Sequence, residues 1–63
     1  MSNHQKAELR ARAAAAQDMR AGEGPFTGII GGSAWSVWYD DEYKSLAGAT
    51  RSEIESRLEE LTK

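Results

Sequence analysis

The chain offers few side chains that could carry out catalysis. A nucleophile needs a base beside it, and the one histidine, His4, stands in the first turn of an expected helix. There is no cysteine, so disulfides and thiolate zinc sites are excluded, and one histidine is too few for a structural zinc. We therefore expect no enzymatic activity, no metal and no cofactor.

An acidic triplet, Asp40-Asp41-Glu42, is the densest group of charges in the chain. Calcium loops alternate their ligands and include a glycine, and this triplet does neither. Aromatic residues flank the acids, which predicts an aromatic patch with a negative rim, a surface that binds proteins well. The residues expected to contact a partner protein are Ile29, Trp38, Asp40, Asp41, Glu42 and Tyr43.

Basic residues gather at the other end of the chain. Residues 1–21 hold four basic and two acidic groups, a net charge of +2, whereas residues 22–63 hold four basic and eight acidic groups, a net charge of −4. Phosphate binding needs clustered Lys and Arg, so nucleic acid is not the expected partner of the acidic part. The first helix could contact nucleic acid, or its basic residues could simply be solvated; they are Lys6, Arg10, Arg12 and Arg20.

A helix is expected to position these basic residues. Ser2 and Gln5 have the spacing of a capping box, alanines favour helix through Arg20, and Gly22 stops it. The helix either packs on the domain or projects as an arm that a partner orders. Its candidate packing face follows the i, i+4, i+7 pattern and consists of Leu9, Ala13, Ala16 and Met19 or Arg20.

The aromatic segment alternates like a β-hairpin. Residues 26–30 and 33–39 are predicted strands, and Gly31-Gly32 suits the tight turn between them. The register places Ile29 and Trp38 on the face opposite the core, where the first helix or a partner would cover them. The predicted core face consists of Phe26, Ile30, Trp35, Val37 and Tyr39.

A third strand, residues 43–48, is predicted in one of two registers, one of which turns Lys44 and Leu46 toward the core. The last helix is the clearest element, because Thr50 and Glu53 form a capping box and an apolar stripe follows at i, i+4 and i+7: Ile54, Leu58 and Leu61.

The expected fold class is therefore α+β, a helix, a three-stranded antiparallel meander and a helix in one small domain. Its parts are an Ala-rich N-terminal helix (1–21), a Gly/Pro linker (22–25) and a ββ(β)α core (26–63). No apolar run reaches the roughly 20 residues of a membrane span and no signal peptide is visible, so a cytoplasmic protein that does not contact membranes is expected.

These features predict a non-catalytic protein-binding module whose partner is a larger protein, with a basic surface on that partner as one expectation. Size and charge are analogous to those of small inhibitors from phages and mobile elements, such as anti-CRISPR proteins, and the acidic groups could imitate nucleic-acid phosphates. The alternative is a structural or assembly protein that buries its apolar surplus in a homo-oligomer. A third function is a nucleic-acid-binding regulator that uses the first helix.

Overall fold

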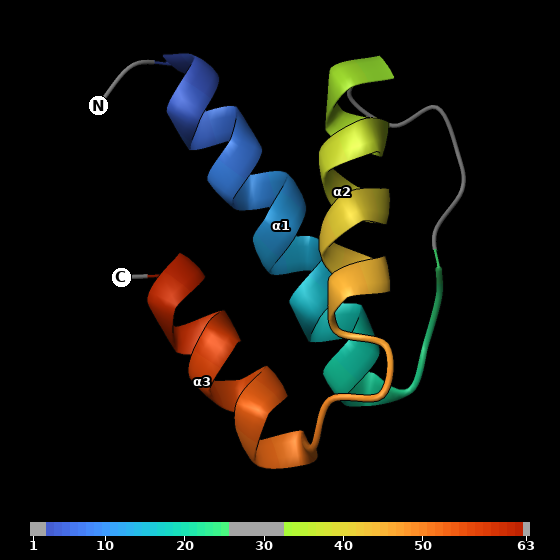
Figure 1. Ribbon diagram of the computed structural model, residues 1–63. Coiled ribbons are helices and arrows are strands. Elements are labelled where there is room, and N and C mark those ends of the chain that lie inside the picture. Colours follow the sequence, from blue (N-terminus) through green and yellow to red (C-terminus); the bar gives the residue numbers. More distant parts are fainter. Residues whose placement is uncertain (1–2, 26–32, 63) are drawn as a thin grey trace.

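Three helices make up the described part of the chain. The computed structural model describes residues 3–25 and 33–62, in which the helices are α1 (Asn3–Ala21), α2 (Ser33–Ser45) and α3 (Arg51–Leu61) (Figure 1). These described residues contain no strand, so the predicted α+β class is wrong. In Figure 1, α1 and α2 run in the same direction and α3 runs in the opposite direction.

The first helix agrees with the sequence prediction. Its capping residue Ser2 lies outside the described residues, but its end is clear. Gly22 adopts a φ of 74°, its N–H donates to the Met19 carbonyl at 3.2 Å, and the Glu23 N–H donates to the Asp18 carbonyl at 2.8 Å. This pair of bonds is the Schellman arrangement, in which the left-handed residue is usually glycine.

The predicted hairpin is wrong, because its second strand falls within α2. Residues 33–39 belong to a helix, residues 43–45 continue it, and residues 46–48 form a turn, so neither register of a third strand applies. The predicted first strand, with Phe26, Ile29 and Ile30, lies outside the described residues. Of the expected core face, Tyr39 is buried at 1% exposed but Val37 is 64% exposed, because a helix separates residues that a strand would align.

The last helix is confirmed. The Glu53 N–H donates to the Thr50 hydroxyl at 3.2 Å, and the Thr50 N–H donates to the Glu53 carboxylate at 2.9 Å. The apolar stripe of α3 faces inward, with Ile54 and Leu61 buried and Leu58 packed beside them.

The core forms where both other helices rest on α1. The predicted face of α1 is confirmed: Ala16 is fully buried against Ile54 and Leu61, and Leu9, Ala13 and Met19 pack around them. Ala11 and Ala15 are also fully buried, and their spacing puts them on the same helix face as Asp18, which bonds to Tyr39 of α2. Small side chains let helix backbones approach closely, so the alanines serve packing as well as helix propensity.

The bundle is open between α2 and α3. Each of these helices packs against α1, but their described backbones do not come into contact with each other (Figure 1). Leu46 is buried in the core with Ile54 and Leu61, but it lies in the turn after α2 and not on a strand. Side chains must therefore connect the two outer helices.

Candidate functional site

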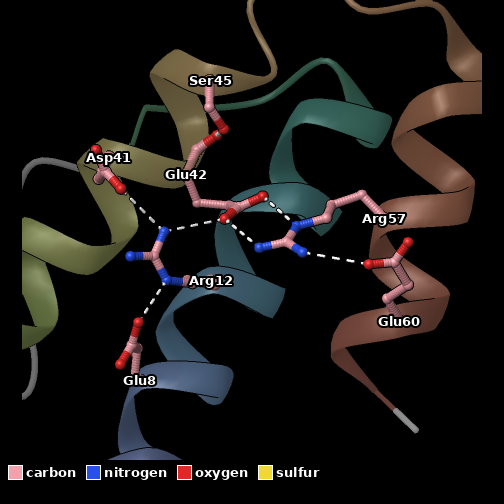
Figure 2. Close-up of polar contacts among 7 residues, drawn as sticks. All are labelled: Glu8, Arg12, Asp41, Glu42, Ser45, Arg57 and Glu60. Carbon is pink, nitrogen blue, oxygen red and sulfur yellow. Dashed lines mark hydrogen bonds and ion pairs between the residues drawn. The ribbon is translucent and has the colours of Figure 1, made fainter.

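A buried carboxylate stands at the centre of the bundle. Glu42 of α2 is only 2% exposed and meets an arginine from each of the other helices (Figure 2). Arg57 of α3 donates from Nε to Oε2 at 2.7 Å and from Nη2 to Oε1 at 3.0 Å, while Arg12 of α1 donates from Nη1 to Oε1 at 3.1 Å. The two parallel bonds from Arg57 are the strong, forked form of this interaction.

Three further acids complete this ion-pair cluster. Arg12 also donates from Nε to Glu8 at 2.9 Å and from Nη1 to Asp41 at 3.0 Å, and Arg57 donates from Nη1 to Glu60 at 3.3 Å (Figure 2). The ion-pair cluster therefore consists of Glu8, Arg12, Asp41, Glu42, Arg57 and Glu60. The buried side-chain polar atoms of the described residues all have hydrogen-bond partners.

The cluster holds its central groups in their charged forms. Hydrogen bonds from Arg57 lower the pKa of Glu42, against the opposing effect of burial and with further help from Arg12. The bond to Glu42 raises the pKa of Arg57, and although burial lowers the pKa of Arg12, its bonds to three carboxylates raise it more. A carboxylate so stabilised is a weak base, so this arrangement suits holding helices together rather than proton transfer.

An aromatic ladder runs along α2 beside the cluster. Trp35, Tyr39 and Tyr43 stand four residues apart, and their rings stack with centroid distances of 5.4 and 5.9 Å and interplanar angles of 17°. The Tyr39 hydroxyl donates to the Asp18 carboxylate, and the Tyr43 hydroxyl donates to the Glu23 carbonyl at 2.8 Å. The ladder therefore joins α2 to the C-terminal part of α1 and the residues after it.

The opposite side of α2 remains accessible. Ala34 and Val37 are exposed, Trp38 is half-buried, and the Asp41 side chain is 67% exposed. These four residues follow the i, i+3, i+4, i+7 spacing of one helix face, and we call them the α2 outer face. The Trp38 ring meets the His4 ring edge to face, with a centroid distance of 4.9 Å and an interplanar angle of 85°.

The residues predicted to contact a partner are thus separated. Trp38 and Asp41 lie on the α2 outer face, and Asp40 is beside it, paired with Lys44 at 2.9 Å. Glu42 is buried in the ion-pair cluster and Tyr43 is in the aromatic ladder, while Ile29 lies outside the described residues. Val37 was assigned to the core by the strand pattern, although its i, i+4 spacing to Asp41 was a signal for a shared helix face.

The basic residues of α1 are separated in the same way. Arg12 points into the ion-pair cluster and Arg20 lies 3.8 Å from Glu55 of α3, whereas Lys6 and Arg10 are exposed. Intramolecular pairs also occupy most of the acids that could imitate phosphates, including Glu55 and Glu60.

The described residues include no group of three or more His, Asp or Glu side chains that could hold a metal ion. None of the three described helices combines the length and the apolar character that crossing a bilayer requires. Comparisons of the chain with protein-family models, with curated proteins and with solved structures found no match.

Proposed function

We propose that the protein is a non-catalytic protein-binding module and that the α2 outer face contacts its partner. The observation that carries this proposal is the position of Val37, a branched apolar side chain that is 64% exposed in the middle of α2. It is the large hydrophobic residue that the described part of the chain leaves exposed.

Val37 contributes little to the fold. Valine costs about 0.5 kcal/mol relative to alanine within a helix, because its branched side chain loses rotamer freedom. Because an exposed side chain removes little apolar surface from water, the hydrophobic effect does not offset this loss. Stability alone would thus favour alanine here, and a role in binding accounts for the valine.

Trp38 supplies the adjacent anchor. Tryptophan is enriched among the residues that dominate binding free energy, and this one is half-buried, so part of its ring remains available. The edge-to-face contact with His4 restricts the ring before any partner arrives. A side chain that is ordered in advance loses less entropy on binding.

The chemistry of the α2 outer face indicates the kind of partner. Its apolar part, Ala34, Val37 and Trp38, is followed by Asp41, whose carboxylate is 67% exposed although Arg12 contacts it. The complementary surface is an apolar groove with a basic side chain at its rim, because opposite charges at the rim set orientation and association rate. A larger protein with a basic patch beside an apolar groove fits this description.

The experiment separates binding from folding by the substitution Val37→Ala. The variant should be as stable as the wild type or more stable by about 0.5 kcal/mol in urea denaturation. Binding should weaken by roughly tenfold, because two buried apolar carbons are lost at about 0.8 kcal/mol each; calorimetry with a partner isolated from the source organism and then purified measures it. Lys6→Gln, on a different helix face, is the matched control and should leave that binding unchanged.

A light-scattering mass series comes first, because the alternative function is self-assembly. A monomer leaves the α2 outer face available to another protein. A stable oligomer that Val37→Asp dissociates would replace the proposal by the homo-oligomer. If Val37→Ala bound the purified partner as tightly as the wild type, the α2 outer face would not be the contact surface.

A further inference from the structure

The side of α1 that faces away from both other helices carries only basic charge. Asn3, Lys6, Arg10 and Gln17 are exposed and spaced by three, four and seven residues, which places them on one side of the helix. The two acids of α1 point elsewhere: Glu8 bonds to Arg12, and Asp18 accepts a bond from Tyr39 of α2. A ligand that approaches α1 from solvent therefore meets lysine and arginine first.

Two more arginines extend this surface at the C-terminal end of α1. Arg20 and Arg51 line a shallow depression of about 380 Å³ together with Gln17 and Ala21. Both arginines lie near the same Glu55 oxygen, at 3.8 and 3.4 Å. We call Lys6, Arg10, Gln17, Arg20 and Arg51 the basic strip. Two acids, Glu55 and Glu59, line a second depression with Arg20, so four positive and two negative charges give the strip a local net charge of +2.

The composition of the basic strip distinguishes between two kinds of anionic partner. Protein interfaces are built around apolar or aromatic anchors, and the strip has none. Lys, Arg and Gln are the side chains that commonly bind the phosphates of nucleic acids. We infer that the basic strip binds the phosphate backbone of duplex nucleic acid without reading its sequence.

The dimensions agree with this inference. From Lys6 to Arg20 the helix rises about 21 Å, and the same length of a DNA duplex carries about twelve phosphates. The acids of the α2 outer face and of the ion-pair cluster lie on other sides of the molecule, and physiological salt screens charges beyond about 8 Å. The overall net charge of −2 therefore does not prevent binding at the strip.

The test uses fluorescence anisotropy with labelled DNA and RNA duplexes of about 24 base pairs and arbitrary sequence. With two net charges neutralising phosphates, affinity for the DNA duplex should fall about 12-fold between about 50 and about 200 mM salt. The double variant Lys6→Gln and Arg10→Gln should reduce the slope of log affinity against log salt by about 1.8. Both positions are exposed and glutamine is a good helix former, so the variant should fold.

The control is Lys44→Gln, which removes an exposed positive charge from α2 and should leave the salt slope unchanged. Binding of either duplex with these dependences supports the inference. It is overturned if neither duplex binds at about 50 mM salt, if the double variant binds as the wild type does, or if an acidic polyglutamate peptide binds more tightly than the duplexes. The last result would assign the strip to an acidic protein instead.

Discussion

Arg57 donates two parallel hydrogen bonds to Glu42, at 2.7 and 3.0 Å. These bonds connect α3 to α2, whose described backbones do not contact each other. The Glu42 carboxylate is almost fully buried, whereas the Arg57 side chain is 37% exposed and keeps access to water. Arg12 reaches the same carboxylate from α1. This one acid therefore fixes where α3 lies relative to α2.

Removing the charge of Glu42 should destabilise the bundle substantially. Glu42→Gln leaves two arginines without their shared counter-charge, and breaking a buried pair costs about 3–5 kcal/mol. Because both arginines are partly exposed, we expect a smaller loss of about 2–3 kcal/mol in urea denaturation. Glu60→Gln is the control, since that carboxylate is 66% exposed and contacts the same Arg57, and it should cost less than about 0.5 kcal/mol.

The difference in stability between the wild type and Glu42→Gln should depend on pH. The pKa of Glu42 is lower in the folded protein than its ordinary value of 4.5, so the carboxylate stabilises the fold above that value and loses this effect as the pH falls through the folded pKa. The difference should be largest near pH 7 and should shrink below about pH 4.5. Denaturation of both proteins across this range measures it, and a difference that stays constant down to about pH 3 would contradict the assignment.

Replacing the central charges together should be far less harmful than removing one. The triple variant Arg12→Met, Glu42→Leu, Arg57→Met avoids the desolvation of the ions and keeps good helix formers. We expect it to be at least as stable as the wild type, by up to about 3 kcal/mol, in chemical denaturation. A triple variant less stable than the wild type would show that the ions contribute net stability beyond their desolvation.

The two tyrosine hydroxyls of the aromatic ladder should differ in their contributions. Tyr39 is buried and its hydroxyl donates to the Asp18 side chain, so Tyr39→Phe should cost about 1.5 kcal/mol. The Tyr43 hydroxyl donates to an exposed carbonyl, so Tyr43→Phe should cost less than about 0.5 kcal/mol. Both variants keep their stacked rings, so thermal unfolding followed by circular dichroism compares the hydroxyls alone; equal losses would contradict this difference.

Local signals were sufficient for the first and last helices. The box formed by Thr50 and Glu53 and the stripe at Ile54, Leu58 and Leu61 depend on residues within two or three turns of one another, and the structure has both. The end of α1 at Gly22 is likewise decided by a left-handed residue next to the helix.

The aromatic segment was predicted wrongly, because its residues fit both the two-residue period of a strand and the four-residue spacing of a helix. Trp35, Val37 and Tyr39 alternate as in a strand, while Trp35, Tyr39 and Tyr43 repeat every four residues as in a helix. Aromatic and β-branched residues favoured the strand, and the i, i+4 pair of Asp40 and Lys44 favoured the helix that the structure has. The ion-pair cluster could not be predicted, because Arg12 and Glu42 are thirty positions apart and only the fold brings them together.

Charge is distributed unevenly among the three helices, and this gives α1 a role besides packing. Within their bounds, α1 has four basic and two acidic residues, whereas α2 has three acids and one base and α3 has four acids and two bases. The basic helix α1 therefore offsets part of the negative charge that α2 and α3 carry, while Arg57 and Glu42 attract each other across those two helices. A chain without α1 would lose Arg12, this partial neutralisation and the packing surface at once, so the pair between Arg57 and Glu42 would have to hold α2 and α3 together without them.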